Sequence, residues 1–144
     1  MTTIREQCLA AFATGLGTVP GVTVERNRTA RVRKFPSAIV LDGGQTPNTA
    51  STQATFYTLR VSVETWITAS ADAALGPGIS GMYGKILTAA LADPTLGGVA
   101  VDVREGEMSD PEIDREEGIG PTAAFEIGFE IDFLTAEGDA SALP

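Results

Sequence analysis

The chain has 144 residues with ten basic and nineteen acidic side chains, one cysteine and no histidine, which gives a net charge of −9 at neutral pH. This length supports one domain with a real core, and the lack of histidine excludes Ser-His and Cys-His nucleophilic catalysis. A lone cysteine favours a reducing compartment, and the acidic balance disfavours tight binding to DNA or to an anionic membrane, because both would be repelled.

The first fifty residues predict one helix and two short strands. Thr3 and Glu6 fit a capping box, so a helix is expected from about residue 3 to 15. Its apolar face recurs every four residues and places the cysteine in the core: Ile4, Cys8, Phe12 and Leu16. Short strands are expected at 22–24 and 38–41, and the polar segment 42–52, which has no periodicity, is expected to be a long loop.

The rest of the chain predicts a second helix and three more strands. Residues 56–67 alternate between apolar and polar side chains, which is the pattern of a half-buried strand. Residues 79–91 have the spacing of an amphipathic helix, and the glycines and proline at 76–78 predict a late, irregular start. A strand is expected from Val99, and residues 125–133 show the cleanest alternation in the chain.

Together these elements predict a single α+β domain. We expect a mainly antiparallel or mixed sheet of about five strands, with two helices packed on one face and a polar surface on the other. The domain is expected to cover residues 1–136, and residues 137–144 are expected to form a flexible C-terminal tail. The N-terminus has no signal-peptide pattern and no segment is apolar enough to span a membrane, so we expect a soluble protein made in a cytoplasm.

Charge is divided along the chain. The first hundred residues carry eight basic and six acidic side chains, a net of +2, and the last forty-four carry two basic and thirteen acidic, a net of −11. Five basic residues lie in one short stretch: Arg26, Arg28, Arg31, Arg33 and Lys34. Seven acidic residues lie in another: Glu105, Glu107, Asp110, Glu112, Asp114, Glu116 and Glu117. Complementary patches on one molecule favour head-to-tail contact between identical subunits, which closes into a ring or continues as a filament.

These stretches also permit other chemistry. The alternating carboxylates of residues 110–116 could bind a hard cation, although Arg115 stands where a calcium loop requires glycine. The basic stretch could contact a nucleic-acid backbone, but only Phe35 is nearby for base stacking, which favours an acidic protein surface as its partner. The acidic stretch is expected to be a solvated, mobile run that a partner orders, because its like charges repel one another.

The whole chain resembles the tail terminator, or tail completion, proteins of long-tailed bacteriophages and related gene-transfer particles. The resemblance rests on the opening helix, the strand 58–64 and three further segments: Thr18-Val-Pro-Gly-Val-Thr-Val-Glu-Arg26, Ala92-Asp-Pro-Thr-Leu-Gly-Gly-Val-Ala-Val-Asp-Val-Arg-Glu105 and residues 122–138. It implies a non-enzymatic structural protein without cofactor or metal. Such proteins form a ring, commonly a hexamer, that caps the head-proximal end of the tail tube and joins it to the head connector.

The resemblance further implies the partners and the location. Expected partners are other copies of the chain, the tail-tube protein and a head-closure or connector protein, assembled in the host cytoplasm, with no membrane involved. DNA would pass through the ring without sequence-specific binding, and an acidic inner wall would repel its phosphates. Candidates for that wall are Glu126, Glu130 and Asp132. The alternatives are another head-tail connector, a tail-tube subunit, a small enzyme that uses a divalent cation, or a cellular binding module with a β-sheet surface.

Overall fold

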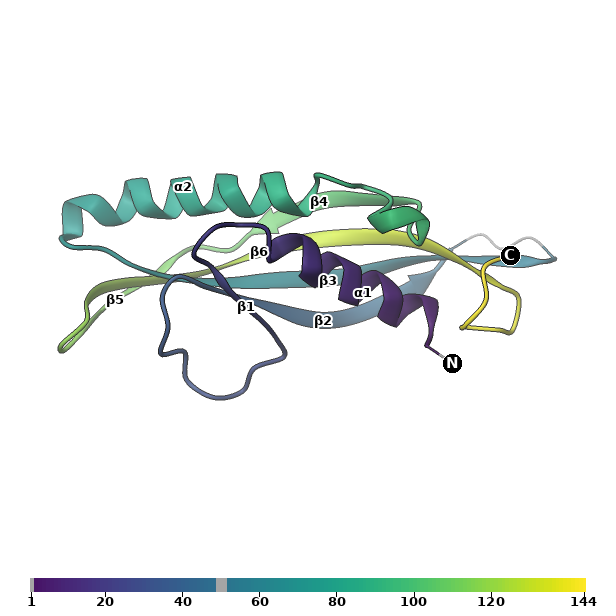
Figure 1. Ribbon diagram of the computed structural model, residues 1–144, viewed down its shortest axis with the longest axis horizontal. Coiled ribbons are helices and arrows are strands. Elements are labelled where there is room, and N and C mark those ends of the chain that lie inside the picture. Colours follow the sequence, from purple (N-terminus) through teal and green to yellow (C-terminus); the bar gives the residue numbers. More distant parts are fainter. Residues whose placement is uncertain (1, 49–51) are drawn as a thin grey trace.

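The computed structural model describes residues 2–48 and 52–144 and shows an elongated α+β domain (Figure 1). The two helices are α1 (Ile4–Leu16) and α2 (Asp72–Ala90), and a short 3-10 turn, η1 (Leu96–Gly98), follows α2. The strands are β1 (Thr23–Arg26), β2 (Ser37–Pro47), β3 (Ala54–Thr68), β4 (Asp102–Met108), β5 (Glu112–Glu116) and β6 (Gly120–Ala136). The fold class predicted from the sequence is confirmed.

The described strands form one mixed sheet in the order β1-β2-β3-β6-β4, with β5 also paired to β6. The β1–β2 pair is parallel, and the pairs of β2 with β3 and of β6 with β3, β4 and β5 are antiparallel. Strands β4 and β5 follow one another along the same side of β6, because β4 pairs with residues 127–132 and β5 with residues 120–124. The sheet therefore has six strands, where the sequence predicted about five.

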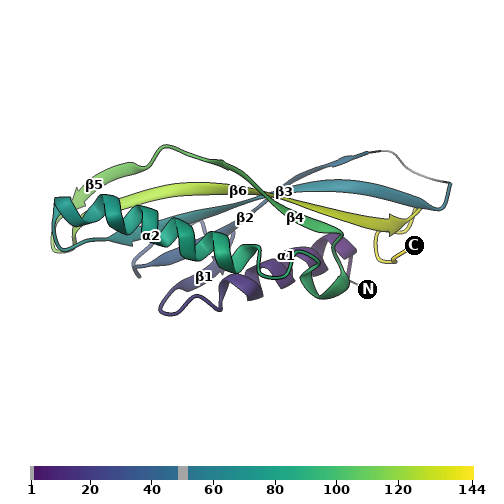
Figure 2. The ribbon, with the colours of Figure 1, turned by 90° about the horizontal axis from the view of Figure 1, so that it is seen from above.

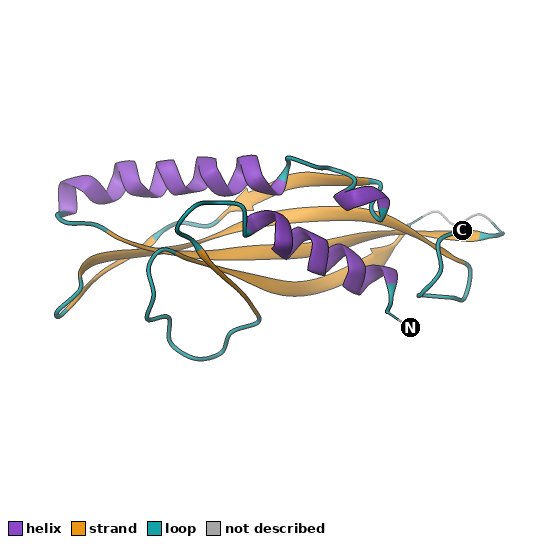
Figure 3. Ribbon diagram, viewed as in Figure 1, coloured by secondary structure: helices purple, strands orange, loops and turns teal. Residues whose placement is uncertain are grey.

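Both helices cover one side of the sheet, which we call the helix face, and leave the outer face without helices (Figures 1, 2 and 3). The predicted alternation of β6 is confirmed, because every second side chain from Phe125 to Phe133 is at most 2% exposed. These side chains pack with the buried face of β3 and with α1, where Phe12 meets Phe129 with ring centroids 5.3 Å apart. Cys8 is fully buried in this core, and burial raises the pKa of its thiol to about 11.

The predicted start of the second helix is wrong. Helix α2 begins at Asp72 and continues through Gly76, Pro77 and Gly78. Leu75, only 3% exposed, is buried on the turn before the proline, so tertiary packing outweighs the low intrinsic helix propensity of this segment. Among the described residues, no helix is both long and apolar enough to cross a membrane.

The predicted loop 42–52 is wrong over its first half, because β2 continues through Pro47. The pairing with β3 is interrupted once, by a register shift between Asp42 and Gln45. Gly43 lies at this bulge, where a Cβ atom would overlap the main-chain carbonyl of Arg60, so a glycine is required for the close approach. The alternation of this half of the strand is hard to see in the sequence because its side chains are polar or absent. Residues 49–51 lie outside the described part of the chain.

The acidic stretch, expected to be a mobile run, contains regular strand structure, and its mobility in the free subunit stays a prediction. Its residues form the end of β4 and all of β5, each hydrogen-bonded along β6. The strand predicted from Val99 starts at Asp102, since η1 and a turn precede it, and Val101 is 48% exposed while Val103 is buried. Main-chain pairing with a long central strand outweighs the mutual repulsion of the carboxylates.

The C-terminal tail, residues 137–144, turns back onto the domain. The amide of Ile4 donates to the carbonyl of Ala140 at 2.8 Å, and the amide of Ala136 donates to that of Ala142 at 2.8 Å. The tail thus supplies an acceptor for the start of α1. Its flexibility in solution stays a prediction.

Replacing Phe129 with Ala should lower the free energy of unfolding by about 3 to 5 kcal/mol, because it empties the centre of the contact between β6 and α1. The control on the same strand is Glu126→Gln, three residues earlier and on the exposed outer face, which should change stability by less than about 0.5 kcal/mol. Urea unfolding of both variants measures the difference. Equal stabilities would contradict the register of β6.

Candidate assembly surfaces

The basic stretch belongs to two different environments. Arg26 is the last residue of β1 and lies on the helix face, whereas Arg28 to Lys34 lie in the connection to β2, which we call the basic loop, residues 27–36.

Val32 and Ile39 are buried at 7% and 2% exposure but lie outside the main core cluster. Ile39 is paired in register with Glu64, which places it on the outer face, so that face is not uniformly polar.

Arg26 holds three elements of the fold together. Its guanidinium donates to Glu6 of α1 at 2.5 and 3.1 Å and to Asp42 of β2 at 2.8 Å. The hydrogen bond from Arg26 lowers the pKa of the Glu6 carboxyl, and the two carboxylates raise the pKa of Arg26. The sequence predicted Arg26 as an interface residue, but in the structure its charge is satisfied within the chain.

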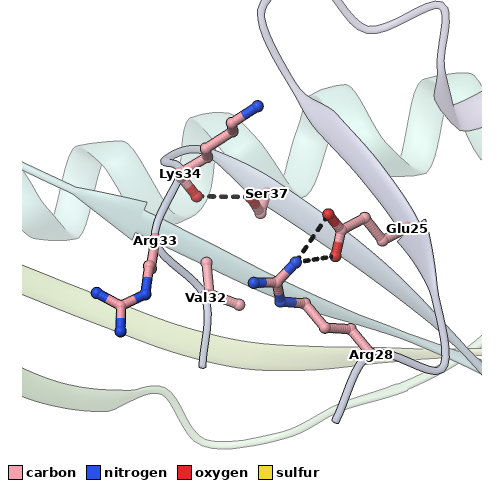
Figure 4. Close-up of a pocket in the computed structure, with 6 residues that line it drawn as sticks. All are labelled: Glu25, Arg28, Val32, Arg33, Lys34 and Ser37. Atoms are coloured by element: carbon pink, nitrogen blue, oxygen red, sulfur yellow. Dashed lines mark hydrogen bonds and ion pairs between the residues drawn. The ribbon is translucent and has the colours of Figure 1, made fainter. Parts of the chain in front are cut away.

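Two more arginines of the basic stretch are bound internally. Arg28 donates to the Glu25 carboxylate at 2.7 and 2.9 Å (Figure 4). It also donates to the carbonyl oxygens of Ala30 and Arg31, at 3.1 and 2.9 Å, which fixes the start of the basic loop. Arg31 forms an ion pair with Glu116 of β5. The basic and acidic stretches therefore touch within one chain at this point.

Arg33 and Lys34 are the unpaired cations of the basic loop. In the described part of the chain their side chains have no ion pair, and both residues are exposed. Figure 4 shows the two charged ends pointing in different directions, away from the Arg28–Glu25 pair, around a hollow of about 280 Å³. Charges that diverge into solvent suit an extended partner surface better than one small anion.

The acidic stretch, residues 105–117, forms one outer edge of the sheet, and we call it the acidic edge. Glu112, Asp114 and Glu116 share the outer face, and the intervening Ile113 and Arg115 point to the helix face. Arg115 pairs with Asp72 at the start of α2 at 3.0 Å, while Glu105 accepts a hydrogen bond from Tyr83. Glu107, Asp110 and Glu117 are all exposed.

A shallow acidic hollow of about 360 Å³ lies on the outer face beside the acidic edge. Four carboxylates line it together with Trp66: Glu64, Asp110, Glu112 and Glu126. The Trp66 indole donates to Glu64 at 2.6 Å, so one of the four is already engaged. Within residues 2–48 and 52–144, no three potential metal ligands converge.

The three side chains predicted to line a channel are not equivalent. Glu126 is exposed, Glu130 is half-buried, and Asp132 is only 6% exposed. Arg104 on β4 pairs with Asp132 and Glu130, the latter at 2.9 Å, and Thr58 donates to Asp132 at 2.9 Å. Asp132 therefore belongs to a neutralised network and does not face open space.

The sequence interpretation missed Arg104 as the cation of the outer face. Its two closer partners, Asp132 and Glu130, lie on β6 and are identified only by the register that pairs Arg104 with Glu130, while Asp102 on β4 is 3.8 Å away. Arg60 is a second exposed cation on this face and donates to Thr46 at 3.1 Å. The middle of the outer face thus carries mixed charge, and the surplus of acid lies toward β5.

Comparisons with known proteins give little guidance. No family model matches the sequence, and no curated protein matches it. Among solved structures, a chain described as "Virion of native gene transfer agent (GTA) particle" is similar over 92% of this chain and 92% of its own length, at 12% identity and a TM-score of 0.32. At this TM-score the likeness carries no argument about family or function.

Asp132→Asn should lower the free energy of unfolding by about 1 to 3 kcal/mol, because it weakens a nearly buried pair and leaves Arg104 with a poorer acceptor. Glu130→Gln removes a half-buried carboxylate from the same arginine and should cost less than about 1 kcal/mol. Urea unfolding at neutral pH compares the two. An Asp132 variant as stable as the Glu130 variant would show that the network does not stabilise the fold.

Proposed function

We propose that this chain is a structural virion protein that forms a ring at the head-proximal end of a phage-type tail, where it caps the tube and joins it to the head connector. The observation that carries the proposal is the separation of unpaired charge. Arg33 and Lys34 extend from the basic loop. Along the acidic edge, four carboxylates form no ion pair with any described residue: Glu107, Asp110, Glu112 and Glu117. A subunit with two complementary surfaces in different places associates head to tail.

The sequence resemblance to tail terminators supports the same proposal. Its segments fall on the elements that build the fold: α1, the turn into β1, the centre of β3, the connection from α2 through η1 into β4, and β6. They are therefore spread over the whole domain and do not form one local motif.

The enzyme alternative receives no support from the geometry. Within the described residues, the carboxylates of the acidic edge and its hollow do not converge on one point, and Cys8 is buried with a raised pKa. Activation of water or of a nucleophile requires a poised base or a bound metal, held in position.

A tail-tube subunit is the second candidate, because of one observation. The segment 42–47, predicted as part of a loop, is strand, so β2 continues beside β3 and β6 past the N-terminal end of α1 (Figures 1 and 2). This end of the sheet could reach a neighbouring ring. A tube subunit polymerises into filaments with itself, whereas a terminator stops at one ring.

Light scattering of the purified protein, alone and with its tail-tube protein, tests the proposal. We expect a single ring mass, reached alone or on the tube, without growth at high concentration. Filaments of the protein alone would favour the tube subunit. A strictly monomeric state that persists at high concentration and with tube protein would refute ring formation.

Lys34→Glu should weaken assembly, because it reverses one of the two unpaired cations of the basic loop. Its stability should change by less than about 0.5 kcal/mol, since the side chain is exposed. The matched control is Lys85→Glu, the same reversal on the exposed side of α2. Assembly is measured by sedimentation at low and high salt, and equal assembly of the two variants would contradict a role for the basic loop.

A further inference from the structure

The sheet is open, and each of its two outer sides adjoins a charged segment, although Arg31 of the basic loop already reaches Glu116 of the acidic edge within the chain. Strand β1 forms one side and leads directly into the basic loop, and β4 and β5 form the other side, the acidic edge. Within the described residues β1 pairs only with β2, and β5 pairs only with β6, so each has one unpaired row of main-chain groups. Such rows are templates for another strand.

The hydrogen bonds of β6 identify the unpaired groups of β5. The carbonyl oxygens of Glu126 and Asp132 accept hydrogen bonds from the amides of Ser109 and Val101, both at 2.8 Å. The main-chain N–H and C=O groups of even-numbered residues of β6 therefore point toward β4 and β5. Because main-chain groups alternate along a strand, the partners of Ala124 and Thr122, namely Glu112 and Asp114, bond to β6. The N–H and C=O groups of Ile113 and Arg115 therefore point away from the sheet.

The same argument applies to β1. The amides of Thr23 and Asn27 donate to the carbonyl oxygens of Pro36 and Val40, at 3.1 and 2.9 Å, on the β2 side. The main-chain groups of Val24 and Arg26 consequently point outward. Each of the two strands thus offers two outward residues, and the strands have similar lengths of four and five residues.

Side chains restrict which strand can pair with β5. Two copies of β5 would bring Glu112, Asp114 and Glu116 against the same carboxylates, which is destabilising across a strand pair. Charged outer strands commonly prevent such self-pairing. Ile113 of the same strand is 68% exposed. An exposed apolar side chain does not prevent pairing with another strand in the way that a charged side chain does. The acidic side chains of β5 therefore favour a partner strand that lies next to basic residues, and the exposed Ile113 leaves room for such a strand to pair.

We propose that β5 of one copy pairs with β1 of the next copy, so that the sheet continues from subunit to subunit. Main-chain hydrogen bonds form at Ile113 and Arg115, and the acidic edge lies against Arg33 and Lys34 of the neighbour's basic loop. This inference rests on the proposed assembly into a ring and names the contact that holds the ring together.

The first test is Ile113→Pro in the full chain. Proline removes the outward N–H of residue 113 and leaves the bonds of Glu112 and Asp114 to β6 in place. Ile113→Val is the matched control, because it keeps the N–H group. Sedimentation should show association of the proline variant weakened about tenfold or more, which is the change expected from losing one main-chain hydrogen bond at each contact, while the valine variant assembles like the parent. Circular dichroism and melting check that both variants fold.

The second test uses charge and does not depend on a proline. Glu112→Lys and Lys34→Glu should each weaken association, and the chain that carries both changes should recover it, because every contact then has the two charges exchanged. Normal association of a folded Ile113→Pro variant, or no recovery in the double variant, would overturn the strand pairing while the ring stands. A parent chain that never associates would refute the ring itself.

Discussion

The pairing of β3 with β6 is the constraint on which the rest of the structure depends. The register runs without interruption from Ala54↔Ala136 to Thr68↔Thr122. Strands β2, β4 and β5 pair directly with one side of this pair, and β1 joins the sheet through β2. Both strands have every second side chain buried on the helix face, so the pair forms the floor on which α1 and α2 pack. A slip of one residue would turn the apolar row toward the outer face, and the burial of that row therefore fixes the register.

The flanking strands adapt to the central pair by bulging. Strand β2 shifts register between Asp42 and Gln45, and β4 shifts between Glu105 and Met108. Glycines allow both irregularities: Gly43 approaches the main chain of Arg60, and a Cβ atom at Gly106 would lie 3.1 Å from the carbonyl oxygen of Gly128. Bulges increase local twist, so the outer strands turn while the central pair stays continuous.

The sequence predicted the parts of this fold in which burial imposes a period. The alternation around Phe129 and the spacing around Phe12 identified a central strand and a helix, because each must bury one face. The predicted start of α2 was wrong, because the packing of Leu75 outweighs the low helix propensity of glycine and proline. Strand β5 was not predicted, because its side chains are mostly exposed and charged, and only its pairing with β6 identifies it as a strand. The sequence did not predict the ion pairs of Arg26 and Arg104, because both depend on which residues the strand register brings together.

The structure reduces the charge division seen in the sequence to a few unpaired side chains. Arg26, Arg28 and Arg31 are neutralised within the chain, so most of the basic stretch contributes to the fold, and only Arg33 and Lys34 remain for a partner. The acidic edge keeps a larger surplus. At physiological ionic strength the screening length is about 8 Å, so two cations cannot act over the width of a subunit. Complementarity must therefore operate by direct contact, and a contact between strands supplies what two cations alone do not: main-chain hydrogen bonds that fix the distance and orientation of the neighbouring copy.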